Sequence, residues 1–462
     1  MLFNSLPFLY VFLPAAYFVF WKLRTKSARY IWLAVTGYMF YSFWNYKFCG
    51  LLLFSTVVSY LAGLGFLRWT DARRRTLCLV LPIVSDLAIL AFFKYTNFGL
   101  DTLARLGRWT GHPFQPGLLH VVLPVGISFY TFHNISYIVD SYRGVVKPTR
   151  NFWEYACYVS LFSQLVAGPI IRFRQIEADL DRIDMTDRTR YVNEGWSFFT
   201  LGMVQKVLIA DTIAAIINPA LAHYTELSTV GTWLCMLGYS YQLYFDFAGY
   251  SHMAVGLGFL FGLRIPQNFN SPYKALNITD FWRRWHISLT SCLRDYIYIP
   301  LGGNRVSRWK VNRNILITLL LGGLWHGANW TFVCWGLYHG VLLVAYHVWG
   351  EYWDRWSATV RRIGTFLLVL IGWVLFRSES FGMAATILKK MLFFESGRLL
   401  AGAGTLVACV AVAGFVAHWS RNTFELQHRW HAPQAAALAS LFLLCLLKIT
   451  GAQPSPFLYF QF

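Results

Sequence analysis

Long apolar stretches with almost no charged residues are the feature that most constrains the fold of this chain. Charged residues make up only 13% of the 462 residues, while 56% are hydrophobic and 18% are aromatic. An ordinary soluble domain has roughly a quarter of its residues charged. So little polar surface cannot cover a globule in water, whereas a lipid bilayer accommodates it. The composition therefore excludes a soluble enzyme and a disordered chain, and it predicts an integral membrane protein.

The apolar runs predict an all-α, polytopic membrane protein with about 11–13 transmembrane helices. From residue 118 to residue 349 the runs are interrupted by Gly, Pro, His or Asp. At membrane depth such interruptions occur only where the backbone is buried in protein or lines a cavity, so we expect re-entrant or interfacial helices among the spans. The expected spans are, approximately, Leu6–Trp21, Tyr30–Trp44, Phe48–Trp69, Leu77–Phe93, Leu118–Val139, Phe152–Ile171, Gly195–Ile217, Thr232–Leu263, Ile315–Trp349, Ile363–Phe376, Leu399–Val416 and Ala435–Leu447.

The basic residues predict the orientation. The 40 Lys and Arg outnumber the 21 Asp and Glu, which gives a net charge of +19, and such an excess collects in cytoplasmic loops near anionic lipids. Four basic residues at positions 22–29 follow the first run and none precedes it. This order is the reverse of a signal peptide and predicts a retained helix that starts outside. Residues 264–313 contain nine basic and two acidic residues, so we expect them on the cytoplasmic face, and charges spaced in this way do not predict nucleic-acid binding.

The chain is predicted to be a single membrane domain, residues 1–462, because no repeat and no Pro-rich or Ser-rich linker divides it. Its eight cysteines stand singly without a C-x-x-C pair, which is typical of buried apolar side chains. We therefore expect no metal and no tightly bound cofactor. Motifs of a serine nucleophile, a phosphate loop, a dinucleotide site and a zinc protease are absent from the sequence.

Two histidines within a long apolar stretch form the strongest candidate site. His326 stands between Trp325 and Gly327, and His339 follows in the same stretch. An ionisable side chain at membrane depth is costly to bury and suggests a function. A near-neutral imidazole can act as a general base on a hydroxyl, but a hydrogen-bonded packing histidine explains the same residues. From chemistry alone both interpretations of His326 stay open, and packing is favoured for His339.

A second candidate lies in the basic segment, where Asp280-Phe-Trp-Arg-Arg-Trp-His286 follows Asn277. Asn277 is typical of a helix N-cap and Asp280 of a first turn, and the aromatic face with its arginines suits a helix in the membrane interface. An amphipathic anchor with a core histidine is the alternative. Asp246 and His252 are weaker candidates, either as an intramembrane relay or as a structural polar pair.

Several long motifs, in order along the chain, resemble the membrane-bound O-acyltransferase family, and within it the branch that acetylates exported bacterial polysaccharides such as alginate. Together they are far more specific than any single short pattern. The motifs are Leu2-Phe-Asn, Leu123-Pro-Val-Gly-Ile-Ser-Phe-Tyr-Thr-Phe, Ile138-Val-Asp-Ser-Tyr-Arg143, Ala167-Gly-Pro169, Asp280-Phe-Trp-Arg-Arg-Trp-His-Ile-Ser-Leu289, Leu293-Arg-Asp-Tyr-Ile-Tyr-Ile-Pro-Leu-Gly-Gly-Asn-Arg305, Trp325-His326-Gly327 and Phe457-Leu-Tyr-Phe-Gln-Phe462.

The resemblance implies a central tunnel in which His326 is catalytic and His286 is the second polar position, within a catalytic core of approximately residues 118–349. It implies a multi-pass protein of the bacterial inner membrane that takes an acetyl group from a cytoplasmic donor, with acetyl-coenzyme A as the expected donor substrate. It also implies periplasmic partner proteins that pass the group to a polysaccharide. We further predict that the residues flanking the two histidines contact substrate, namely Arg283, Arg284, Trp325 and Asn329.

Two alternatives remain at this point. Broken helices with buried His and Asp also describe the binding sites of secondary transporters, although an inverted repeat is not visible. A relative that moves another acyl group, such as D-alanine to a cell-wall polymer, is the alternative among enzymes.

Overall fold

The computed structural model describes residues 1–462 except 118, 399, 452–456 and 459–462. The described residues fold into helices joined by loops, and their one β-contact is an isolated bridge between Leu227 and Arg398. The all-α fold class is therefore confirmed. Leu118 and Leu399, at which two of the expected spans begin, and the last four residues of the closing motif lie outside the described part.

Six segments of the described chain are helical, long and apolar enough to cross a membrane, which makes this a polytopic membrane protein. Two shorter apolar helices accompany them, at Phe8–Lys22 and Ala403–His418. The six segments are Lys26–Arg68, Ala72–Trp109, Val192–Ala222, Trp330–Asp354, Ala358–Arg377 and Ala432–Gly451.

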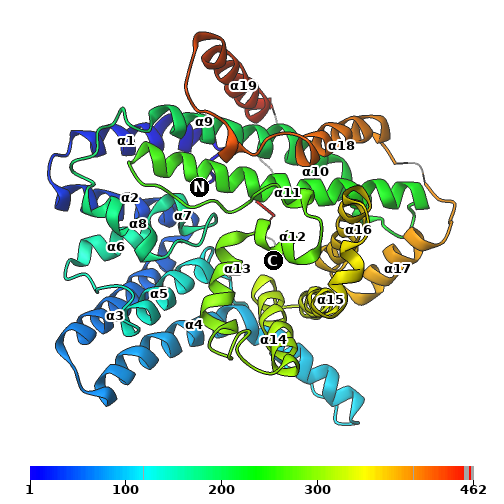
Figure 1. Ribbon diagram of the computed structural model, residues 1–462, viewed down its shortest axis with the longest axis horizontal. Coiled ribbons are helices and arrows are strands. Elements are labelled where there is room, and N and C mark those ends of the chain that lie inside the picture. Colours follow the sequence, from blue (N-terminus) through cyan, green and yellow to red (C-terminus); the bar gives the residue numbers. More distant parts are fainter. Residues whose placement is uncertain (118, 399, 452–456, 459–462) are drawn as a thin grey trace. The chain divides into compact units, whose positions relative to one another are not determined.

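Two compact units make up the chain, and each is described by itself. The first comprises residues 1–195 and 257–266. In it, α3, α4 and α5 pack together (Figure 1), and α2 packs on α6, where a Cβ at Gly37 would lie 1.8 Å from the carbonyl oxygen of Ser160. The helices of this unit are η1 (Phe8–Phe12), α1 (Leu13–Lys22), α2 (Lys26–Asn45), η2 (Tyr46–Phe48), α3 (Cys49–Arg68), α4 (Ala72–Trp109), α5 (Ile127–Tyr142), α6 (Phe152–Ser160), α7 (Phe162–Leu165) and α8 (Phe173–Asp181).

The second unit comprises residues 196–256 and 267–462, and α9 and α11 run through both units. It holds both candidate histidines. Its helices are α9 (Val192–Met203), η3 (Val204–Ala210), α10 (Asp211–Ala222), α11 (Thr229–Leu260), η4 (Pro272–Lys274), α12 (Ile278–Arg284), α13 (Ile287–Leu293), η5 (Arg294–Tyr298), α14 (Arg308–His326), α15 (Trp330–Asp354), α16 (Ala358–Arg377), α17 (Phe381–Leu392), α18 (Ala403–His418), η6 (Thr423–Glu425) and α19 (Ala432–Gly451).

The interrupted runs fold in different ways. The run predicted at Thr232–Leu263 is one continuous helix, α11, despite its glycines and its Asp. The run at Ile315–Trp349 breaks at Gly327, whose extended backbone ends α14, and restarts as α15 with Asn329 as its N-cap. The predicted single domain and the core at residues 118–349 stay predictions.

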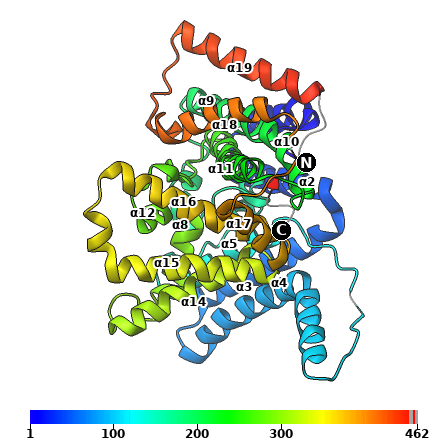
Figure 2. The same cartoon turned by 90° about the vertical axis from the view of Figure 1, so that its right-hand side faces the viewer.

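The hairpin of α14 and α15 fixes the position of His326 (Figures 1 and 2). Gly323 and Gly336 face each other where the two helices contact, and a Cβ on Gly323 would lie 2.3 Å from the carbonyl oxygen of Phe332. A Cβ on Gly336 would lie 2.3 Å from the carbonyl oxygen of Leu319. Small residues allow this close backbone approach, which is how membrane helices commonly pack.

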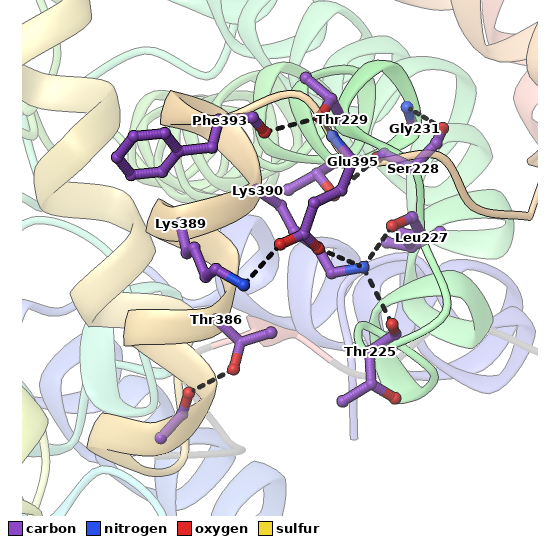
Figure 3. Close-up of polar contacts among 12 residues, drawn as sticks. Thr225, Leu227, Ser228, Thr229, Gly231, Thr386, Lys389, Lys390, Phe393 and Glu395 are labelled. Atoms are coloured by element: carbon purple, nitrogen blue, oxygen red, sulfur yellow. Dashed lines mark hydrogen bonds and ion pairs between the residues drawn. The ribbon is translucent and has the colours of Figure 1, made fainter.

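A polar cluster ties the end of α17 and the loop after it to the start of α11 and the segment before it (Figure 3). Lys390 donates to the carbonyl oxygens of Thr225 and Leu227, at 2.9 and 2.5 Å. The hydroxyl of Thr229 donates to the carbonyl oxygen of Phe393 and accepts from the backbone N–H of Glu395. Because these bonds join segments far apart in the sequence, they hold this end of the second unit together.

Candidate active site

His326 is the last residue of α14 and is almost fully buried. Aromatic rings surround it, with centroid separations of 4.9 Å to Trp325, 5.0 Å to Trp335 and 5.3 Å to Phe376. Three helices supply these rings, since Trp335 lies on α15 and Phe376 on α16. The imidazole is thus held among aromatic side chains in an environment shielded from bulk water.

His286 lies beside His326, with 6.4 Å between the ring centroids. It is fully buried in the short connection between α12 and α13, and its backbone is left-handed (φ 43°). A non-glycine residue in this conformation is strained, and such strain is often found at functional sites. The ring of Phe247 on α11 packs edge-on against it at 4.7 Å, and its Nδ1 lies 3.1 Å from Oδ1 of Asn268.

The structure therefore brings the two predicted catalytic histidines together, and Trp325 with them, since its ring lies 6.0 Å from that of His286. Their catalytic roles stay predictions. Sequence reasoning missed Asn268, Trp335 and Phe376. Only tertiary packing places these three residues around the histidines, and no local pattern distinguishes them.

A cavity of about 930 Å³ lies in the same unit, between the segment 279–319 and the end of α15. Its charged lining includes Arg283, Arg294 and Arg308, while apolar side chains such as Leu293 and Leu319 line the rest. Arg294 is ion-paired with Asp295 at 2.7 Å, and no ion pair of Arg283 or Arg308 occurs among the described residues. Two acids on α15, Glu351 and Asp354, also line the cavity, and Arg361 neutralises Asp354 at 2.6 Å.

Trp282 connects this cavity to the histidines. Its side chain lines the cavity and packs against Trp335, with 5.8 Å between the ring centroids. Trp335 in turn contacts His326. Two packed aromatic side chains, Trp282 and Trp335, therefore link the arginine-lined cavity to His326.

The other predicted substrate-binding residues have structural contacts. Asn329 caps α15 by accepting from the backbone N–H of Thr331, and it donates to the carbonyl oxygen of Glu379 at 2.9 Å. Arg284 is ion-paired with Asp280 at 2.8 Å and donates to the carbonyl oxygen of Asn270. Only Arg283 of the two arginines lines the cavity. Substrate contacts of these residues stay predictions.

His339 is a packing residue in this structure. It is fully buried against Phe281, Trp282 and Trp335, and neither ring nitrogen has a hydrogen-bond partner within the described chain. This position agrees with the interpretation favoured from the sequence, in which His339 is a packing residue.

Asp246 and His252 do not form a pair with each other. Asp246 is ion-paired with the buried Lys206 at 2.5 Å, and Lys206 also contacts Asp211 at 2.7 Å. His252 contacts Gln205 through Nδ1 at 2.8 Å. The two residues therefore connect α11 to the α9–α10 segment, as structural polar contacts do.

Comparison with known proteins shows the family of this chain. Residues 145–378, which contain both histidines and the whole cavity lining, match the membrane-bound O-acyltransferase family. A probable alginate O-acetylase, AlgI, of Pseudomonas aeruginosa is 42% identical over 95% of this chain and 85% of its own length. A peptidoglycan O-acetyltransferase of Helicobacter pylori is 36% identical over 85% of this chain and 80% of its own length. A teichoic acid D-alanyltransferase of Bacillus subtilis is 30% identical over 60% of this chain and 75% of its own length.

Proposed function

Because the chain belongs to the membrane-bound O-acyltransferase family and is thus an O-acyltransferase, we propose that it transfers acetyl from acetyl-coenzyme A. The acetyl group leaves the donor at the cytoplasmic face of the bacterial inner membrane and serves the O-acetylation of an exported polysaccharide such as alginate. Periplasmic partner proteins carry the group to the polymer. Because the family consists of acyltransferases, the alternative interpretation as a secondary transporter is rejected.

The single observation that carries the choice of donor is the arginine-lined cavity two rings away from His326. Coenzyme A combines phosphates with a long, thin arm that ends in the thioester. Arginine suits phosphate recognition because its planar guanidinium donates two parallel hydrogen bonds. The segment that supplies the arginines is the strongly basic one, residues 264–313, which the charge rule assigns to the cytoplasmic side.

Acetyl rather than D-alanyl transfer is supported by the extent of the relationships. The relatives named as O-acetylases align with 85% or more of this chain, whereas the D-alanyltransferase of Bacillus subtilis aligns with 60%. A D-alanyl donor on a carrier protein would also have to present its acyl arm through the same cavity.

The chemistry is an acyl transfer in which an ester replaces a thioester. The acceptor hydroxyl oxygen attacks the thioester carbonyl carbon while His326 accepts the hydroxyl proton. The carbon–sulfur bond breaks, and the imidazolium returns the proton to the coenzyme A thiolate, so the products are an O-acetyl ester and free thiol. His286 orients the acceptor hydroxyl or polarises the carbonyl. The rings around His326 limit hydrolysis of the donor.

Arg308→Gln is expected to raise the KM for acetyl-coenzyme A about tenfold with little change in kcat, because one charge-assisted phosphate contact is worth about 1.5 kcal/mol. The purified protein in nanodiscs is assayed for release of free coenzyme A at increasing donor concentration. Lys310→Gln is the matched control, since Lys310 is on the same helix turn but does not line the cavity. The effect of Arg308→Gln should shrink with added salt.

An equal KM for Arg308→Gln and Lys310→Gln would show that the cavity does not bind the donor. Turnover with a D-alanyl carrier protein as donor, and none with acetyl-coenzyme A, would show that the donor is a carrier-bound acyl group. The assignment as an acyltransferase would stand.

A further inference from the structure

Asn268 is the centre of a buried hydrogen-bond cluster next to His286. Its Oδ1 accepts the backbone N–H and the hydroxyl of Ser288, at 3.2 and 2.8 Å. The same Oδ1 lies 3.1 Å from Nδ1 of His286. Its Nδ2 donates to the hydroxyl of Ser251 on α11 at 3.2 Å. All four side chains are buried.

The backbone N–H of Ser288 fixes which end of the Asn268 amide faces the histidine. A backbone N–H can only donate, so the amide atom next to it must be the oxygen. An inverted amide would place two donors against each other. Because Oδ1 is an acceptor, Nδ1 of His286 must carry the proton to complete the bond. The Ser288 hydroxyl, 3.5 Å from Nδ1, fits the same tautomer, because it spends its own proton on Oδ1 and can only accept from Nδ1. In a neutral ring Nε2 then carries the lone pair.

The backbone holds this arrangement in place. The N–H of Ile287 donates to the carbonyl oxygen of Asn268 at 2.9 Å, and the left-handed conformation of His286 turns its ring toward the amide. Burial lowers the pKa of His286 to about 3, so the ring is neutral at pH 7. The rings packed against it are those of Phe247 on α11, Phe269 in the preceding loop, and Trp325 and His326 on α14, and His326 is the titratable one among these four.

We propose that Asn268 is a positioning residue that holds His286 as the Nδ1–H tautomer, so that Nε2 accepts a hydrogen bond from the acceptor hydroxyl as it binds, before the hydroxyl turns its single proton to His326 for the attack. This inference rests on the proposed function, and it selects between the two roles left open for His286. A lone pair on Nε2 can orient a hydroxyl. It cannot polarise the thioester carbonyl, because that role needs a donor.

The tautomer can be observed without turnover. ¹⁵N NMR of protein labelled in histidine separates protonated from unprotonated ring nitrogens, and a His286→Gln sample identifies the His286 signals. We expect a protonated Nδ1 and an unprotonated Nε2 in the unmodified protein. Asn268→Leu should give a mixture of tautomers. Ser288→Ala removes a hydroxyl that donates to Oδ1 and lies 3.5 Å from Nδ1, but it leaves Oδ1 in place as the acceptor and should keep the Nδ1–H form.

Activity provides the second readout. Asn268→Leu is expected to lower kcat by roughly 10- to 100-fold, part of the contribution of a positioned polar group, with little effect on the KM of the donor. Asn268→Asp keeps an acceptor at Nδ1 but adds a negative charge that favours the imidazolium. The protonated ring cannot accept from the hydroxyl, so the acid limb of the kcat profile should move to higher pH. Ser288→Ala should leave that profile unchanged.

A protonated Nε2 on His286 in the unmodified protein would overturn the proposal. The proposal would also be overturned if Asn268→Leu kept the tautomer of His286 and only lowered the thermal stability of the protein. That result would mean that Asn268 serves packing alone. If acetyl-coenzyme A is not the donor, the activity assays fail for every variant alike, while the NMR result still decides the tautomer.

Discussion

Replacing His326 with Ala is expected to abolish acetylation of the exported polymer while the protein still folds and inserts. A positioned general base contributes about 10²–10⁴-fold to such a reaction, and the rings of Trp325, Trp335 and Phe376 around His326 cannot accept a proton in its place. The measurement is the O-acetyl content of polysaccharide from a strain that lacks the gene and carries either the unmodified or the altered copy. We expect the altered copy to give the acetyl content of the deletion strain.

His339→Leu is the matched control for this experiment. His339 is another buried histidine, one helix further along, and its ring packs against Phe281, Trp282 and Trp335. Leu has a similar size and keeps the packing, so most of the acetylation should remain. Normal acetyl content with His326→Ala would refute the catalytic role. Equal loss in both variants would mean that any change in this helical hairpin disables the protein.

Gly323→Ala is expected to destabilise the protein by about 3 kcal/mol and to inactivate it. Alanine is the better helix former by about 1 kcal/mol, so a loss must come from the helix crossing. There the added Cβ would lie 2.3 Å from the carbonyl oxygen of Phe332 and 3.0 Å from Cα of Gly336. Overpacking of this kind costs about 1–3 kcal/mol or more. Forcing α14 away from α15 also displaces His326, and a shift of about 1 Å can cost 10²-fold in rate.

The neighbouring glycine supplies the control. A Cβ on Gly322 would meet only Cδ1 of Leu293, at 3.1 Å, the end of a flexible side chain. Gly322→Ala should therefore keep the thermal unfolding temperature and the activity of the unmodified protein in detergent, whereas Gly323→Ala should lower both. A normal unfolding temperature for Gly323→Ala would show that the two backbones are not in contact.

The sequence predicted the membrane class and the helical fold because composition and long apolar runs depend on few details. It was less informative about helix limits. The glycines and the Asp in the run at Thr232–Leu263 suggested a break, yet α11 is continuous. Asp246 on this helix is stabilised by Lys206, a residue on η3 that lies 40 positions earlier in the chain. Such long-range pairing cannot be inferred from one run.

The two histidines could be predicted because an ionisable residue in an apolar stretch is conspicuous on its own, and the motifs around them resemble a known family. Their surroundings could not. Asn268 lies in a loop without any chemical motif, and only the fold brings its amide to His286. Arg284 and Asn329 were predicted from their neighbours in sequence, but their side chains form an ion pair and a helix cap. Position next to a catalytic residue in sequence does not determine the direction of a side chain.

The most direct test of the proposed acetyl transfer uses the purified protein in nanodiscs with acetyl-labelled coenzyme A. Loss of label from the donor is followed for the unmodified protein and for His326→Ala. We predict that the unmodified protein removes the label and that His326→Ala does not, which would establish the donor and the catalytic histidine together. If neither protein removes label, even when the candidate periplasmic partner is present, acetyl-coenzyme A is not the donor and the proposed reaction is contradicted.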